Sequence, residues 1–257
     1  MYGDFQGLAV ERRGATAWVH LGETHLNPEL AEVFRRLNTD PEVRSVVLTG
    51  AEERAFCVGG GGAGAPRDEA GRNAYWFRGM AGAREVILSL LDCDKPIIAR
   101  INGHAVGKGC SIALCCDITV MVTEAKIGDT HVKVGLACGD GGSLLWPNLV
   151  GPMLSKRYLL TGDLLTGQEA AAVGLVTEAV SRGDLDKRID FWRQRLEQGS
   201  PAAVALTKRA LNSALRQQAI AHMDLSLGLE TLSFLTEDHR EGAAALSEKR
   251  RAEFIGR

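Results

Sequence analysis

The stretch Pro96-Ile97-Ile98-Ala99-Arg100-Ile101-Asn102-Gly103-His104-Ala105-Val106-Gly107-Lys108-Gly109 decides the fold, because a β-branched run leads there into a glycine-rich turn. The run predicts a buried strand over 96–101, and Asn102-Gly103 predicts a turn after it. Gly107-Lys108-Gly109 then opens a short buried helix, expected over Gly109–Cys116. The first backbone N–H groups of a helix have no partner within it, so this junction offers free donors beside a strand end. An ordinary strand–turn–helix junction would have the same pattern.

A second glycine-rich loop, Ala55-Phe56-Cys57-Val58-Gly59-Gly60-Gly61, follows the β-branched run Val46-Val47-Leu48-Thr49. Glycine lets a backbone N–H approach a ligand closely, and two N–H groups that converge on one oxygen make an oxyanion hole. The two loops together predict chemistry on a carbonyl group, without indicating which carbonyl compound. Gly59–Gly64 also fits the spacing of a dinucleotide-binding motif, but no helical pattern begins before about Asn73, which argues against that interpretation.

The composition is that of a soluble globular protein of 257 residues, with 45% hydrophobic residues, 24% charged residues and a formal net charge of −2. No basic block stands out, which argues against nucleic-acid binding, and no apolar run approaches the roughly 20 residues that span a bilayer. Residues 1–6 lack the basic and apolar regions of a signal peptide, so we expect a cytoplasmic protein. The six cysteines include no Cys-x-x-Cys pair, so we expect free thiols and no zinc site.

The pattern of elements changes along the chain. Its first part predicts a hairpin of Leu8–Arg13 and Ala15–Leu21, helices over Pro28–Leu37 and Asn73–Leu91, and strands over Arg44–Thr49, 96–101, Ile118–Val122 and Val176–Val180. Its tail predicts four helices, over Asp184–Gln198, Ala202–Gln218, Ala221–Leu235 and Glu237–Phe254. Alternating strands and helices indicate an α/β core in layers. We therefore expect a core over residues 1–198 and a helical lid or oligomerisation region over residues 199–257.

One histidine stands in a setting that suits catalysis. His131 precedes a glycine-rich bend, and Asp140 follows nine residues further on, so the carboxylate could orient the imidazole as a base. A structural histidine followed by a helix-capping aspartate is the alternative, and the residues alone do not favour the catalytic interpretation. Cys138 lies between the two as a further candidate nucleophile, but the five other cysteines have no such setting.

The motifs together resemble one known family over nearly the whole chain. They are Ser45–Gly50, Ala55–Gly60, Ile101–Cys110, Cys116–Ile118, Leu160–Gly162, Ala171–Val176, Thr236–Gly242 and Glu248–Phe254. In these segments the chain resembles the crotonase superfamily, also called the enoyl-CoA hydratase/isomerase family. The resemblance implies an α/β fold, a right-handed spiral of ββα units with a helical C-terminal part. It also implies a homotrimer or a dimer of trimers, and an enzyme acting as lyase, hydrolase or isomerase on acyl-CoA.

The resemblance also implies roles for particular residues. The oxyanion-hole donors of the family match the backbone N–H groups of Gly60 and Lys108, although the second position is normally a glycine. The lysine that approaches the CoA phosphates in CoA-dependent members matches Lys249. CoA would then enter as part of the substrate, and neither a further cofactor nor a metal ion is expected.

Two departures from the family pattern narrow the expected reaction. Simple hydratases handle water with two glutamates, and the matching positions hold Ser111 and His131. The β-diketone hydrolase branch, which includes 6-oxocamphor hydrolase, resembles this chain at His131 and Asp140 and uses that dyad to activate water. We therefore expect His131 and Asp140 to be catalytic, with hydrolytic C–C cleavage of a β-keto acyl-CoA. A hydratase or isomerase in which His131 replaces the glutamate, a CoA-free β-diketone hydrolase and a non-catalytic acyl-CoA binder remain as alternatives.

Overall fold

The computed structural model describes residues 5–22, 27–58 and 69–257, and its main sheet has six strands. In spatial order these are β1 (Leu8–Arg13), β2 (Thr16–Leu21), β3 (Ser45–Gly50), β5 (Ile97–Ile101), β7 (Ile118–Val122) and β10 (Glu178–Val180). β1 and β2 form an antiparallel hairpin, and the other neighbouring pairs are parallel. Every residue of β3 is buried, as expected of a central parallel strand covered on both faces.

A second sheet has four short strands: β4 (Ala55–Cys57), β6 (His104–Val106), β8 (Lys126–Gly128) and β9 (Leu165–Thr166). β4, β6 and β8 follow β3, β5 and β7 in the chain, so each consecutive pair contributes one strand to each sheet. Helix α2 (Glu69–Asp92) follows β4, α3 (Lys108–Leu114) follows β6, and the 3₁₀ turn η1 (His131–Val134) and α4 (Gly142–Thr161) follow β8. This repetition of ββα units is the architecture that the resemblance implies.

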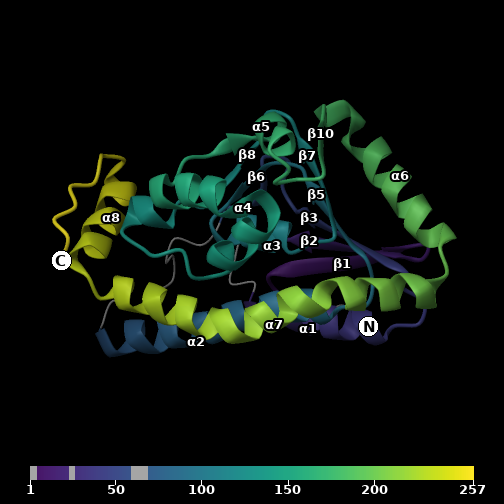
Figure 1. Cartoon of the computed structure of the whole chain (residues 1–257), viewed down its shortest axis with the longest axis horizontal. Coiled ribbons are helices and arrows are strands. Elements are labelled where there is room, and N and C mark those ends of the chain that lie inside the picture. Colours follow the sequence, from purple (N-terminus) through teal and green to yellow (C-terminus); the bar gives the residue numbers. More distant parts are fainter. Residues whose placement is uncertain (1–4, 23–26, 59–68) are drawn as a thin grey trace.

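The remaining helices cover the sheets and form the C-terminal part. They are α1 (Asn27–Thr39), α5 (Gly167–Ala172), the 3₁₀ turn η2 (Arg182–Asp184), α6 (Leu185–Gln198), α7 (Pro201–Phe234) and α8 (Glu237–Glu248). α7 runs along the length of the molecule and packs against α2, which in turn packs against α1 (Figure 1). α8 and the C-terminus lie together at one end (Figure 1).

The predicted elements are largely confirmed, and two predictions for the tail are wrong. Two helices were expected over 202–218 and 221–235, but α7 is continuous, because the junction contains no glycine or proline and Ala219 is fully buried. A helix was expected to reach Phe254, but α8 ends at Glu248, where Lys249 adopts a left-handed conformation.

The second sheet and α4 are not predicted by the sequence patterns. Strands of two or three residues are too short to show an alternating pattern. α4 contains Pro147 and Pro152 and is kinked at Gly151, which has a φ of 75°, so its periodicity is broken. Among the residues that the structure describes, no helix has the length and apolarity to cross a bilayer. The division at residue 198 stays a prediction.

Candidate functional site

His131 lies at the start of η1, just beyond the end of β8. Its backbone N–H donates to Oδ1 of Asp129 at 3.0 Å, and its Nδ1 lies 2.6 Å from the same oxygen. The Asp129 carboxylate therefore holds both the backbone and the ring of His131. This bond fixes the ring orientation and directs Nε2 to the opposite side.

Two further carboxylates face that opposite side. Nε2 of His131 lies 3.7 Å from Oδ2 of Asp140 and 3.7 Å from Oε1 of Glu230. Asp140 comes from the loop before α4, whereas Glu230 comes from α7. The structure thus brings His131 and Asp140 together, but the orienting hydrogen bond is made by Asp129.

Asp140 is held in place by the helix at the glycine-rich junction. Ser111, on α3, donates its hydroxyl hydrogen to Oδ1 of Asp140 at 3.1 Å, and both residues are buried. Position 111 itself carries a hydroxyl group, but the carboxylate of Asp140 lies directly beside it. The other carboxylate oxygen of Asp140 faces His131.

Glu230 reaches the site because α7 approaches the loop before α4 very closely. The hydroxyl of Ser226 donates to the carbonyl oxygen of Gly139 at 2.8 Å. A Cβ on Gly139 would lie 2.5 Å from the backbone carbonyl oxygen of Ser226 and 2.5 Å from Oε2 of Glu230, and because the backbone of α7 cannot move aside, only glycine fits there. Oε2 is buried and has no hydrogen-bond partner among the described residues. A buried oxygen without a partner favours the protonated form of the carboxyl group, and it is free to bind a ligand.

The charges of the cluster shift the proton equilibria of its members. Burial opposes the charged form of His131, but the charge of Asp140 and the hydrogen bond with Asp129 outweigh it, so its pKa rises to about 10. Burial and the charge of Asp140 raise the pKa of Glu230 to about 8. Burial also raises the pKa of Asp140, against the charge of His131. For Asp129 the hydrogen bond and charge of His131 outweigh burial, and its pKa is lowered.

Lys108, the first residue of α3, adds a basic side chain to this cluster. Gly107 precedes it with a φ of 58° and forms the N-terminal cap. Burial lowers the pKa of Lys108, while the charges of Asp140, Cys57 and Glu230 act to raise it. The helix therefore begins beside the cluster. The role of the Lys108 N–H as an oxyanion-hole donor stays a prediction. The other expected donor, Gly60, lies outside the described residues.

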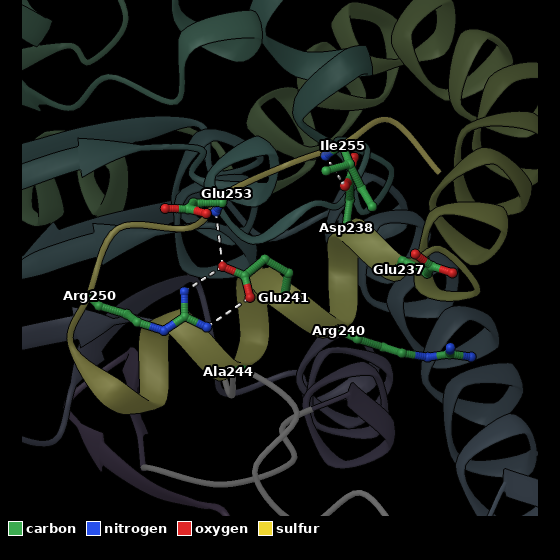
Figure 2. Close-up of a pocket in the computed structure, with 8 residues that line it drawn as sticks. All are labelled: Glu237, Asp238, Arg240, Glu241, Ala244, Arg250, Glu253 and Ile255. Carbon is green, nitrogen blue, oxygen red and sulfur yellow. Dashed lines mark hydrogen bonds and ion pairs between the residues drawn. The ribbon is translucent and has the colours of Figure 1, made fainter.

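Lys249 lies apart from the cluster, where the chain reverses after α8. Its φ is 54°, and it is the one non-glycine residue in the described part of the chain with a positive φ. Beyond it the chain returns along α8, where Nη2 of Arg250 donates to Oε2 of Glu241 at 2.8 Å (Figure 2). The N–H of Glu253 donates to Oε1 of Glu241 at 2.9 Å, and the two segments line an open hollow of about 550 Å³. These contacts fix the turn at Lys249.

Three residues of the cluster could in principle hold a metal ion. The donor atoms of Asp129, His131 and Cys138 all lie within 4.8 Å of one another. The thiol of Cys138, however, donates to Oδ2 of Asp129 at 2.9 Å, and burial raises its pKa well above the usual range. A metal ion would require a thiolate. We therefore interpret the three residues as a hydrogen-bonded chain.

Asp129 and Glu230 belong to the site, although the sequence patterns did not indicate them. The position of Asp129 gave a usable signal, because an aspartate side chain often accepts a hydrogen bond from the backbone N–H two positions later in the chain. Glu230 carried none, since a glutamate on a long helix is normally exposed. Its burial depends on the contact between α7 and Gly139, which are distant in the sequence.

The family of the chain follows from comparison with known proteins. The model of the enoyl-CoA hydratase/isomerase family matches residues 23–257. The chain belongs to this family. It is 34% identical over 238 residues to the (E)-benzylidenesuccinyl-CoA hydratase of Thauera aromatica, over 90% of each chain. It is 31% identical over 230 residues to the crotonyl-CoA hydratase of Syntrophomonas wolfei, over 89% of this chain and 87% of that protein.

Solved structures of the enoyl-CoA hydratase/isomerase family share the fold. An enoyl-CoA hydratase/isomerase from Mycobacterium paratuberculosis superposes with a TM-score of 0.86 at 33% identity, covering 95% of this chain and 99% of that one. The crotonase-like fold, the place in the crotonase superfamily and the interpretation as an enzyme are thereby confirmed. The narrower resemblance to the β-diketone hydrolase branch stays a prediction.

Proposed function

We propose that this enzyme acts on an acyl-CoA thioester with a β-keto group or a cyclic diketone, and cleaves a C–C bond by hydrolysis. The observation that carries the proposal is the position of His131 Nε2, which lies 3.7 Å from both Asp140 and Glu230. This separation exceeds a normal hydrogen bond. The three side chains come from three different segments and face one point, where a water molecule and a reacting carbon could meet.

The cleavage needs one proton acceptor and one proton donor. Water loses a proton to the His131–Asp140 pair, and its oxygen adds to the keto carbon. The bond between that carbon and the thioester Cα then breaks, and its electron pair forms the thioester enolate. Glu230 delivers a proton to Cα, which yields a carboxylic acid and a shortened acyl-CoA. Because the pKa of His131 is raised to about 10, its imidazole is protonated at neutral pH, so the Asp140 carboxylate is the member of the pair that accepts the proton of water.

The glycine-rich junction and the C-terminal turn supply the remaining parts of the proposal. The backbone N–H groups of Gly60 and Lys108 stabilise the negative charge on the thioester oxygen. In support, Lys108 begins α3, so its N–H is among the unpaired donors of the helix start. Lys249 contributes a positive charge to the CoA phosphates, since its side chain projects from a turn fixed by neighbouring contacts.

The proposed quaternary structure is a homotrimer or a dimer of trimers in the cytoplasm, with neither nucleic acid nor membrane as a partner. In support, several leucines along α7 are exposed in the single chain, Leu211 to 75% and Leu232 to 62%. Apolar side chains that gather along one helix favour contact with another chain. Light scattering on the purified protein measures the assembly directly.

The reaction is tested by offering the protein β-ketoacyl-CoA esters in water enriched in ¹⁸O. We expect ¹⁸O in the released carboxylic acid, a shortened acyl-CoA, and a strong loss of turnover in His131→Ala. Turnover of a free cyclic β-diketone without binding of any CoA compound would instead favour the CoA-free hydrolase. Binding of acyl-CoA esters without turnover of any would favour the non-catalytic binder.

A second candidate function is hydration or isomerisation of an enoyl-CoA. It is favoured by the placement of Asp140 beside Ser111, because a carboxylate then stands next to one of the two positions where simple hydratases carry glutamates. Glu230 provides another carboxylate close to His131. Fast hydration of crotonyl-CoA by the unmodified protein would establish this candidate and remove the first. We expect that hydration to be slow, and Ser111→Glu to raise it.

A further inference from the structure

Among the side chains of the site, that of Asp129 makes the most hydrogen bonds with described residues. Its Oδ1 accepts from the backbone N–H of His131 at 3.0 Å and lies 2.6 Å from Nδ1. Its Oδ2 accepts from the thiol of Cys138 at 2.9 Å. The side chain is 2% exposed, so water does not supply these bonds. Both carboxylate oxygens are therefore occupied by donors from this chain.

From this arrangement we propose that Cys138 is a positioning residue, whose thiol aims the Asp129 carboxylate so that it orients His131. The inference rests on the proposed role of His131, but its structural part can be tested without substrate. The thiol of Cys138 bonds to one oxygen of the Asp129 carboxylate and Nδ1 of His131 lies against the other, so Cys138 acts on the ring through the carboxylate. The chain of contacts runs from Cys138 to Asp129 and on to His131.

A thiol suits this position because it stays protonated. Burial and the negative charge of Asp129 raise the pKa of Cys138 well above its usual range, so it remains a donor at every working pH. In return, its hydrogen bond adds to the effects that lower the pKa of Asp129. The carboxylate thus keeps its negative charge beside the imidazolium.

The start of α4 lies close to the thiol and the carboxylate. A Cβ on Gly142, the first residue of α4, would lie 2.4 Å from Sγ of Cys138 and 2.7 Å from Oδ2 of Asp129. Glycine at position 142 therefore leaves the space in which the thiol and the carboxylate meet. The two oxygens of the Asp129 carboxylate move together, so a rotation that took Oδ2 away from the thiol would also take Oδ1 away from Nδ1 of His131.

The direct test observes the proton between Nδ1 of His131 and Asp129 by NMR in the intact protein. A short bond of this kind gives a far-downfield proton signal, assigned here by its absence from His131→Ala. The signal disappears on acidification when Asp129 becomes protonated. The charges of Asp140 and Glu230 also act on the ring, and the charge of Lys108 acts on both of these carboxyl groups. All three groups are present in every variant, so a difference between the variants comes from residue 138.

Cys138→Ala removes the donor, and Cys138→Val removes it without leaving a cavity, in case the alanine variant does not fold. Because thiol donation lowers the pKa of Asp129, we expect the signal to disappear at a higher pH in both variants. Cys138→Ser keeps a donor and should restore the original pH. The inference would be overturned if the signal disappeared at the same pH in the unmodified protein and in all three variants. It would also be overturned if Cys138→Ser did not restore the original pH.

Kinetics with the substrate identified for the enzyme supply the second readout. We expect Cys138→Ala to lower kcat about tenfold with little change in KM, in line with the loss of one hydrogen bond to a charged group. Cys93→Ala is the matched control, since Cys93 is buried in the core away from the cluster. An equal loss of kcat in the control would show a general packing effect and remove the positioning role. If no substrate is found, the NMR result still decides the inference.

Discussion

Nε2 of His131 lies 3.7 Å from Oε1 of Glu230, although one residue starts η1 and the other belongs to α7. Burial and the nearby Asp140 charge raise the pKa of Glu230 to about 8, so this carboxyl group holds a proton at neutral pH. A protonated carboxyl group beside a cationic imidazole is an arrangement suited to proton delivery. The long helix α7 thus has a function beyond covering the core.

The role of Glu230 as proton donor predicts the alkaline side of the pH profile. A donor must hold its proton, so kcat/KM should fall as the pH rises through about 8. The charge of Lys108 lowers the pKa of Glu230, and therefore Lys108→Met should move this fall to higher pH. The methionine keeps the backbone N–H of residue 108. An unchanged or downward-shifted alkaline limb in Lys108→Met would contradict the assignment.

The His131–Asp140 pair predicts non-additive losses. His131→Ala or Asp140→Asn alone should lower kcat by roughly 10²–10⁴-fold, the usual range for acid–base catalysis. The double variant should be little worse than His131→Ala, because residues that act as a unit are lost together. Steady-state kinetics on the four proteins provide the test. Losses that multiply fully in the double variant would mean that the two residues act independently.

The parts of the site that the sequence predicts are those linked by short spacing or by a motif. His131 and Asp140 are separated by one glycine-rich bend, and the structure brings them together. Lys108 follows a glycine that suits a helix cap, and α3 does begin there. Asp129 lies only two residues from His131, yet its role depends on a side-chain orientation that spacing alone does not indicate.

Glu230 illustrates what sequence patterns do not predict. The pattern around it indicates a helix, and that prediction is correct, but the buried side of the helix is set by its packing partner. Ser226 and Glu230 face the loop at Gly139, which belongs to a different unit of the fold. The continuity of α7 also mattered, since a break near residue 220 would have redirected this face. Contacts between residues so far apart in the sequence can be identified only from the three-dimensional structure.

The buried ion pair between Lys208 and Asp117 predicts a large effect on stability. Nζ of Lys208 lies 2.6 Å from Oδ2 of Asp117, and the side chains are only 7% and 23% exposed. Lys208→Met would leave a buried carboxylate without its cation, and we expect a loss of roughly 3 kcal/mol in the free energy of unfolding. Urea denaturation at neutral pH measures the difference.

Two further variants separate the ion pair from a general effect of the substitution. Asp117→Asn combined with Lys208→Met should recover part of the loss, because no buried charge then remains unpaired. Arg209→Met is the matched control, since Arg209 pairs with Asp94 at the surface and is 66% exposed. That change should cost less than about 1 kcal/mol. Equal losses of unfolding free energy in Lys208→Met and Arg209→Met would refute the special role of the buried pair.

The turn at Lys249 predicts a charge-dependent contact with CoA. Its φ of 54° is a conformation that glycine adopts readily, so Lys249→Gly removes the charge without disturbing the turn. We expect calorimetric titration with acetyl-CoA to give weaker binding by the variant. The difference should shrink with added salt, because a phosphate contact is screened. Arg251→Ala removes a nearby like charge and serves as the control. If both variants weaken binding equally, the effect comes from the net charge of the tail, and Lys249 makes no specific contact with the phosphates.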